Sequence, residues 1–272
     1  MDVLFLGTAA AEGYPGAFCR CRNCLRASKE GGRSLRKRSA ILVDNELLVD
    51  IPPDLYWSAI THNVDLAHLH SILVTHSHGD HFHPQILEYR KSSFALVPLP
   101  ILTLFCDNAV MPLVKSAVGR IDEARLRLRS IRPYRRYGAK RFDFTPIPAN
   151  HMTSIRGEVS YNYILECDGR EILYASDTGF YASEVLSFLL RRDFDMIIVE
   201  CTMGDKFYKY HMNYELVLAL HQWAKWNCVL KRGAKFIVTH MAHDGCGTHS
   251  EVRSILEPHG ITVAYDGLQV HA

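Results

Sequence analysis

The 272-residue sequence predicts an α/β fold in which helices cover the outer faces of β-sheets. Two observations predict it: short apolar runs come in adjacent pairs and blocks along the chain, and they then alternate with helix-like segments. No short-period repeat and no low-complexity linker divides the chain. We therefore expect a single domain over residues 1–272.

The strand runs are rich in β-branched and aromatic residues. The helical segments are longer and contain both apolar and polar residues. An Asp-Gly pair at 168–169 separates two strand runs and predicts a hairpin. Asn213 is an N-cap candidate for the longest helical segment. The expected strands are 3–7, 39–44, 46–51, 71–76, 101–106, 142–147, 161–166, 171–177, 196–200, 234–240 and 261–266. The expected helices are 53–62, 83–92, 108–118, 181–191, 213–230 and 249–257.

Composition excludes several protein classes. The chain has 31 Lys+Arg against 29 Asp+Glu, and a formal charge of +2 argues against a dedicated nucleic-acid binder. The longest apolar run, 94–105, is cut by Pro98 and Pro100, so no membrane span is expected. The N-terminal MDVLFLG has no basic region before it and predicts a first strand, not a signal peptide. We expect a cytoplasmic protein.

Histidines and an aspartate cluster directly after the strand run 71–74. In the stretch THSHGDH, His76 and His78 point to the same side if the chain is extended, because side chains alternate along a strand. Gly79 permits a sharp turn, after which Asp80 and His81 point back towards the same place. Four metal-competent side chains in six residues predict a metal site.

Three more ligand-type residues lie where a strand run gives way to a loop: His151, Asp177 and His240. Ligands at the carboxyl ends of neighbouring strands can converge on one cleft. Imidazoles and carboxylates together form a mixed nitrogen and oxygen site, which suits zinc or manganese.

A second metal site is predicted from the cysteines. Cys19, Cys21 and Cys24 lie within six residues, and three thiolates from one tight loop suit a tetrahedral zinc of the Cys₃His type. The spacing leaves the fourth ligand open among His243, Cys246 and His249.

The HxHxDH segment, followed by His151, Asp177 and His240, resembles the metallo-β-lactamase superfamily. The resemblance implies an αββα four-layer sandwich and two divalent metal ions. It assigns His76, His78 and His151 to one metal and Asp80, His81 and His240 to the other, with Asp177 bridging them. Asp80 is expected to take part in catalysis as well as in binding.

A narrower resemblance joins FLGTAAAEGYPGAFCRCRNC, THSHGDH, SDT, VTHMAHD and YDGLQV. These segments are similar to the PhnP-like phosphoribosyl cyclic phosphate phosphodiesterases. That family implies a structural zinc on Cys19, Cys21, Cys24 and His243, a general acid at His211, and homodimerisation. The implied substrate is a small, probably cyclic, ribosyl or nucleotide phosphodiester, attacked by hydroxide held at the two metals.

Three other functions remain open from the sequence. A tRNA 3′-processing endonuclease shares the fold but needs an extended basic arm for RNA. A lactone or thioester hydrolase has less need of an acid such as His211. A non-catalytic zinc-binding module would explain the cysteines but not the seven histidines and aspartates. The basic stretches Arg33–Arg38 and Arg132–Arg141 have no obvious pairing acids, and we expect solvated faces or a surface that faces an anion.

Overall fold

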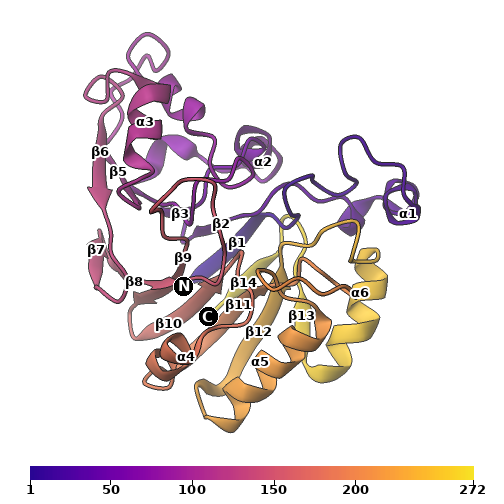
Figure 1. Cartoon of the computed structure of the whole chain (residues 1–272). Helices are drawn as coiled ribbons and strands as arrows, with labels where there is room; N and C mark the ends of the chain where they lie inside the picture. Colours follow the sequence, from indigo (N-terminus) through magenta and orange to yellow (C-terminus); the bar gives the residue numbers. More distant parts are fainter.

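A computed structural model describes residues 1–272 and contains two seven-stranded mixed sheets packed face to face, with helices on the outside (Figure 1). This arrangement confirms the expected αββα four-layer sandwich. The first sheet has the strand order β14-β1-β2-β3-β4-β5-β6. Its strands are β1 (Asp2–Gly7), β2 (Ala40–Val43), β3 (Leu47–Val49), β4 (Ser71–Leu73), β5 (Leu102–Cys106), β6 (Leu126–Ser130) and β14 (Gln269–His271).

The second sheet has the strand order β13-β12-β11-β10-β9-β8-β7. Its strands are β7 (Tyr137–Ala139), β8 (Phe142–Pro148), β9 (Tyr161–Cys167), β10 (Arg170–Ala175), β11 (Phe194–Glu200), β12 (Leu230–Thr239) and β13 (Ile261–Val263). The pairs β10–β11, β11–β12 and β12–β13 are parallel, whereas β9 runs antiparallel to both β8 and β10. The strands β8, β10, β11 and β12 therefore end at the same edge of the sheet.

Each outer face carries its own helices. Helices α2 (Leu55–Thr61) and α3 (Met111–Val118) pack on the first sheet, and α4 (Ser183–Leu189), α5 (Tyr214–Trp226) and α6 (His249–Leu256) pack on the second. Helix α1 (Arg22–Glu30) lies at the side of the sandwich (Figure 1). None of the helices is both long enough and apolar enough to pass through a lipid bilayer.

Apolar residues fill three layers. The middle layer joins the facing sides of the two sheets, where Phe5, Phe105 and Phe144 are among the buried side chains. The outer layers lie between each sheet and its helices. Alternation along the strands explains this division, since successive side chains point to opposite faces of a sheet.

All the expected strands are present, with ends that differ by a few residues. The expected hairpin forms a two-residue turn, in which Asp168 and Gly169 both have positive φ. The expected helix 83–92 is instead a 3-10 segment over Pro84–Arg90. The sequence pattern did not predict α1, β6, β7 or β14, because the first is mostly polar and the strands are short edge strands.

The basic stretch Arg33–Arg38 is not the solvated face that we expected throughout. The Arg36 side chain is buried and donates hydrogen bonds to Thr8 Oγ1 and to the carbonyl of Ala264. Arg38 forms an ion pair with Asp54. The stretch Arg132–Arg141 also finds acidic partners: Arg136 pairs with Asp143, Lys140 with Glu46, and Arg141 with Asp44.

Candidate metal centre

Loops at the carboxyl ends of four strands carry the predicted ligands. His76, His78, Asp80 and His81 follow β4, while His151, Asp177 and His240 follow β8, β10 and β12. The common edge of the second sheet brings the last three together. The amide of Tyr161 donates to the carbonyl of Thr75 at 2.9 Å, which ties the β4 loop of the first sheet to the second.

All seven predicted residues gather in one place, in two groups that share Asp177. In each group the possible ligand atoms all lie within 4.8 Å of one another. The first group is His76, His78, His151 and Asp177, and the second is Asp80, His81, Asp177 and His240. The division is the one that the family resemblance implied.

Asp177 lies between the two groups of imidazoles. Its Oδ1 is 3.0 Å from Nε2 of His240, and its Oδ2 is 3.3 Å from Nε2 of His76. The same Oδ2 lies 3.1 Å from Nε2 of His81. Asp177 has a positive φ of 44°, a backbone conformation that aspartate tolerates better than most residues. One carboxylate can therefore reach two cations.

The hydrogen bonds of His81 and His240 fix their tautomers. Nδ1 of His81 lies 2.7 Å from Asp50 Oδ2, so this nitrogen carries the proton. Thr202 Oγ1 donates to the carbonyl of His240, so it accepts a proton from Nδ1 of the same histidine at 2.9 Å. In both rings Nε2 is the nitrogen that faces the cluster, and the two Nε2 atoms lie only 3.0 Å apart. Two neutral rings would repel at this distance through their lone pairs, so positive charge is required here, either as a proton or as a metal ion.

Two buried atoms in the cluster also have no hydrogen-bond partner of suitable geometry: Nε2 of His76 and Oδ1 of Asp177. Buried polar atoms without partners are rare, and a bound ion is a common reason. The donor set therefore fits divalent cations, with imidazole nitrogens and carboxylate oxygens as ligands.

The carboxylates favour positive charge on the rings beside them. Burial lowers the pKa of His240 and of His81, but Asp177 and Asp80 outweigh it and raise that of His240 to about 10 and that of His81 well above its usual value. A metal ion at Nε2 would take the place of these protons. Burial lowers the pKa of His76 to about 3, so its ring is neutral and able to bind a metal. Burial alone would raise the pKa of Asp177, but His240 and His81 outweigh it and hold that pKa well below its usual range. The bridging candidate is therefore a carboxylate over the physiological pH range.

His211 lies beside the cluster, on the loop between β11 and α5. Its Nδ1 is 2.7 Å from Oε1 of Glu200 and 3.9 Å from Oδ1 of Asp177. Burial lowers the pKa of His211, but the neighbouring Glu200 carboxylate outweighs burial and raises that pKa above its usual value. His211 is thus placed next to the ligands, as the resemblance implied.

Two functional candidates were missed at the level of sequence: Asp50 and Glu200. Both are fully buried, and each binds Nδ1 of a histidine in the cluster. Both close strand runs, ELLVD and MIIVE, which is the same signal that drew attention to Asp177. Such partners orient a ligand and fix its tautomer.

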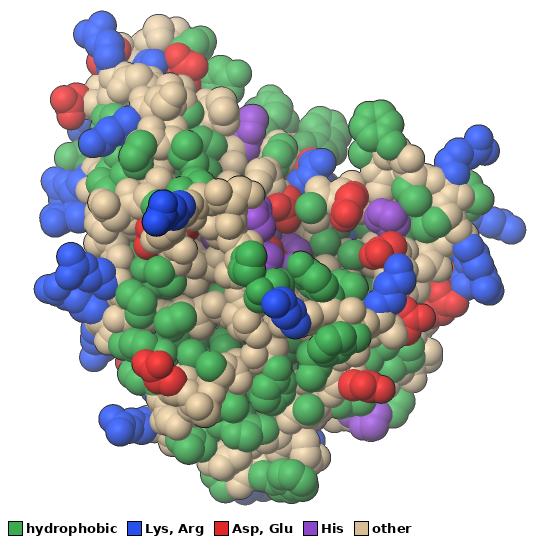
Figure 2. All heavy atoms as spheres, viewed as in Figure 1, with side chains coloured by type: hydrophobic (Ala, Val, Ile, Leu, Met, Phe, Trp, Pro, Cys, Tyr) green, Lys and Arg blue, Asp and Glu red, His purple; other side chains and the backbone are tan.

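A cavity of about 260 Å³ opens onto this cluster. His78, His151, His211 and His240 line it together with Asp80 and Asp177. Figure 2 shows histidine and acidic side chains at the floor of a hollow in this face of the molecule. Glu12 and Asp244 also line the cavity, and no Lys or Arg does so. Positive charge for an anionic substrate must therefore come from bound cations and from His211.

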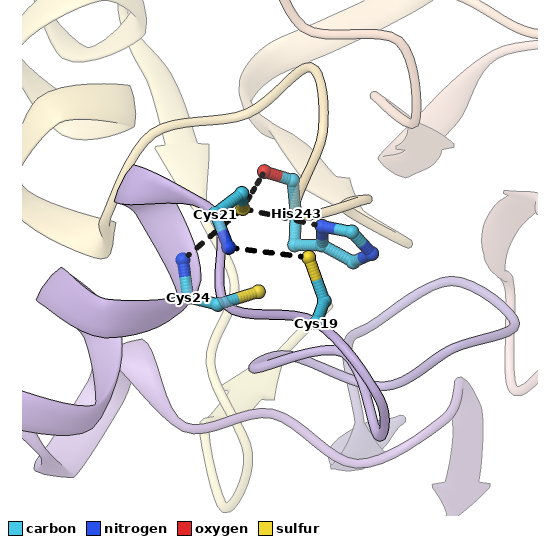
Figure 3. Close-up of side chains that lie close together, drawn as sticks. All are labelled: Cys19, Cys21, Cys24 and His243. Carbon is cyan, nitrogen blue, oxygen red and sulfur yellow. Dashed lines mark hydrogen bonds between the residues drawn. The ribbon is translucent and has the colours of Figure 1, made fainter.

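The three clustered cysteines meet His243 at the start of α1 (Figure 3). The four possible ligand atoms lie within 4.8 Å of one another, and Cys21 Sγ is 3.6 Å from His243 Nδ1. Burial raises the pKa of Cys21, but hydrogen bonding from the Cys24 amide and to His243 lowers it to about 6. A ready thiolate and an S₃N donor set fit a tetrahedral zinc.

The structure separates His243 from the other fourth-ligand candidates. The Cys246 thiol instead donates to the carbonyl of Cys201 at 3.0 Å, and His249 contacts the Arg36 guanidinium. Gly16 is also required here, because a Cβ atom at this position would lie 2.6 Å from His243 Nε2. The cluster joins the 12–24 segment to the 241–246 segment, and both segments contribute to the wall of the cavity.

The fold and the buried His/Asp cluster define a metal-dependent hydrolase. The family model described as the beta-lactamase superfamily domain matches residues 45–241, which is more than half of the chain, and the chain belongs to this superfamily.

Several solved structures share the fold over the whole chain. A diphosphatase from the PhnP family has a TM-score of 0.77 at 20% identity, with 100% of this chain and 97% of that chain covered. Zn²⁺-bound PqqB from Methylobacterium extorquens has a TM-score of 0.78 at 19% identity, with both chains fully covered at 100%. The short form of human tRNase Z has a TM-score of 0.67 at 18% identity, with coverage of 100% and 99%. No curated protein gave a significant match.

Proposed function

We propose that the protein is a phosphodiesterase for a small, cyclic ribosyl or nucleotide phosphodiester. The observation that carries this proposal is the contact between Glu200 and His211 at 2.7 Å. Because Glu200 binds Nδ1, the other ring nitrogen of His211 is the one free to serve a substrate in the cavity. An imidazolium at this place suits a reaction that must protonate an alkoxide as it leaves.

Divalent cations at the two groups of ligands would supply Lewis-acid stabilisation of the phosphoryl oxygens and a water of lowered pKa. His76, His78 and His151 would hold one cation, Asp80, His81 and His240 the other, and Asp177 both. Asp50 and Thr202 hold His81 and His240 in the tautomers that leave Nε2 unprotonated. His211 would give its proton to the departing ribosyl oxygen, and Glu200 would stabilise the cationic ring that does so.

The size and charge of the cavity favour a small substrate. About 260 Å³ holds a compact sugar phosphate, whereas polymeric RNA needs a long basic surface outside the site. The acids Glu12 and Asp244 on the wall are suited to accept hydrogen bonds from sugar hydroxyls. Similarity to the PhnP-family diphosphatase supports phosphoryl chemistry, and similarity to tRNase Z keeps a nuclease as the second candidate.

The test is a hydrolysis panel with protein of defined metal content. The substrates are bis-p-nitrophenyl phosphate, 2′,3′-cyclic nucleotides, ribosyl 1,2-cyclic phosphate, a lactone and a precursor tRNA. We expect the highest kcat/KM on a cyclic phosphodiester. Preference for the lactone would overturn the phosphorus chemistry, and preference for the precursor tRNA would favour the nuclease.

A further inference from the structure

A second cavity, of about 450 Å³, lies between the edges of the two sheets and away from the metal centre. It is bounded by β5 and β6 of the first sheet and by β7 of the second. Its wall includes His70, Thr103, Arg127, Arg129, Tyr137 and Lys140, and we call this cavity the arginine groove. His70 and Ser71 lie in its wall at the amino end of β4, whereas His76 follows the carboxyl end of that strand.

The arginines occupy positions that would ordinarily be apolar. In the parallel pairing of β5 with β6, Arg127 is opposite Thr103 and Arg129 is opposite Phe105. Phe105 points between the sheets and packs on Phe144 of the second sheet, with ring centroids 4.9 Å apart. The arginines therefore share the face that elsewhere forms the middle core, while Leu126 and Leu128 take the opposite face.

The second sheet does not cover this corner. Arg127 and Arg129 are exposed, and polar residues replace the apolar layer around them. Arginines at these positions do not stabilise the core, because exposed arginines bury little apolar surface. Binding of an anionic ligand would explain why arginines occupy these two positions.

Charge in the arginine groove is of one sign. No Asp or Glu lines it, and neither Arg127 nor Arg129 has an acidic partner within ion-pair distance. Lys140 is the exception among the cations, since it contacts Glu46 at 3.2 Å. Figure 2 shows Lys and Arg side chains along the margin of the molecule where β6 and β7 lie.

We propose that the arginine groove binds a small organic phosphate with two or more negative charges, such as a nucleoside diphosphate. The guanidinium groups of Arg127 and Arg129 are two residues apart on one strand, so both reach the same ligand. Each can form a two-pronged contact with phosphate oxygens. Thr103 supplies a hydroxyl donor, and the Tyr137 ring forms an apolar wall, stacked on Phe144 at 5.5 Å.

The size and lining of the arginine groove favour a small ligand over a nucleic-acid strand. A volume of about 450 Å³ matches a nucleotide-sized pocket. A strand of nucleic acid is usually held by successive aromatic platforms, and Tyr137 is the single aromatic side chain in the wall besides the buried Phe105. This proposal is independent of the reaction at the metal centre.

The experiment compares two double variants of equal charge in the metal-loaded protein. R127Q/R129Q removes the two cations of the arginine groove. R125Q/R135Q removes two exposed arginines of the same region that do not line the groove and have no ion pair. Arg135 approaches the wall only through the Tyr137 ring, whose centroid lies 5.9 Å from its guanidinium carbon. The probe is the methylanthraniloyl derivative of ADP, whose fluorescence reports binding, and the competitors are inorganic pyrophosphate and oligouridylate. Thermal unfolding of each variant checks that it is folded.

We expect R127Q/R129Q to weaken probe binding at least about tenfold and R125Q/R135Q to change it less than about threefold. Pyrophosphate should displace the probe from the wild-type protein. Equal losses in both variants would mean a diffuse electrostatic effect, and unchanged affinity in both would mean binding at the metal centre alone. Tighter binding of oligouridylate than of the ADP derivative, lost in both variants, would indicate nucleic acid instead. Each of these three results overturns the proposal.

Discussion

Oε1 of the buried Glu200 lies 2.7 Å from Nδ1 of His211, and this contact aims the other ring nitrogen at the cavity. The same carboxylate accepts a hydrogen bond from the amide of Thr178 at 2.8 Å, directly after Asp177. Glu200 thus links the candidate general acid to the loop that carries the shared metal ligand. One fully buried side chain therefore positions both His211 and the backbone next to Asp177.

His211→Ala should affect turnover according to the leaving group. A ribosyl alkoxide needs a proton as it departs, whereas p-nitrophenolate does not, so only the first reaction depends on an acid. We expect kcat to fall by about 10²–10⁴-fold on a cyclic ribosyl phosphate and by less than about tenfold on bis-p-nitrophenyl phosphate. Steady-state kinetics on the two substrates make the comparison.

Glu200→Gln is the matched variant for this prediction. The amide retains the size of the side chain but removes the charge that stabilises the imidazolium of His211. It should therefore produce the same dependence on the leaving group to a smaller degree. Equal losses on both substrates in H211A would remove the general-acid role and leave His211 a structural residue.

Metal content should respond to Asp177→Asn and Cys24→Ser in different ways. We expect the wild-type protein to bind three metal ions per chain, two at the His/Asp cluster and one at the cysteines. Since Asp177 is common to both groups at the cluster, D177N should lower the count to about one and abolish hydrolysis. Elemental analysis of protein dialysed against trace zinc gives the count. A D177N protein that keeps all three ions would contradict the shared-ligand arrangement.

Cys24→Ser should instead remove the single thiolate-bound zinc. The count should fall from three to two, and the unfolding temperature should fall because this zinc ties the 12–24 segment to His243. For a chain of this size each kcal/mol lost corresponds to about 2–4 °C. Cys228→Ser is the control, because Cys228 is exposed and lies outside the cluster. If both variants melted alike, a structural zinc at this place would be refuted.

The sequence predicted the sandwich and the ligand set because both rest on local patterns. Strand runs are continuous in the chain, and the ligands stand where those runs end. Helix α1 was missed because its buried face is only Cys24 and Ala27, too narrow for helical periodicity. Strand β6 was missed because its alternation of Leu and Arg places charge where a core strand has apolar residues.

Asp50 and Glu200 show a different limit of sequence reasoning. Their position after a strand run is visible, but their role depends on which histidine nitrogen each faces. That relation joins residues 31 positions apart for Asp50 and His81, and no spacing rule encodes it. The arginine groove was not visible in the sequence, because Arg127 and Arg129 lie outside the basic stretch Arg132–Arg141. Its shape comes from two sheet edges that the chain order does not place together.

His249 should make stability depend on pH on the acidic side of neutrality. It is the first residue of α6, and its Nδ1 lies 3.0 Å from Nη2 of Arg36, from which the neutral ring accepts a hydrogen bond. Burial, and then the charges of Arg36, Arg33 and Arg253, lower the pKa of His249 to about 4, with Glu257 opposing them. The folded protein therefore holds this ring neutral where the unfolded chain would protonate it.

The sign of the effect follows from proton binding. Between about pH 6.5 and pH 4 the unfolded chain takes up a proton that the folded protein refuses, so the free energy of unfolding falls as pH falls through this window. The largest possible loss in the free energy of unfolding is about 3 kcal/mol, and about 1–2 kcal/mol is expected once solvent screening is allowed for.

His249→Asn tests this prediction, because asparagine keeps an acceptor for Arg36 and does not titrate. Urea unfolding of both proteins at pH 7.5 and pH 5, at the same free zinc, should give a smaller loss in H249N. A loss of the same size in both proteins would assign the acid sensitivity to other groups.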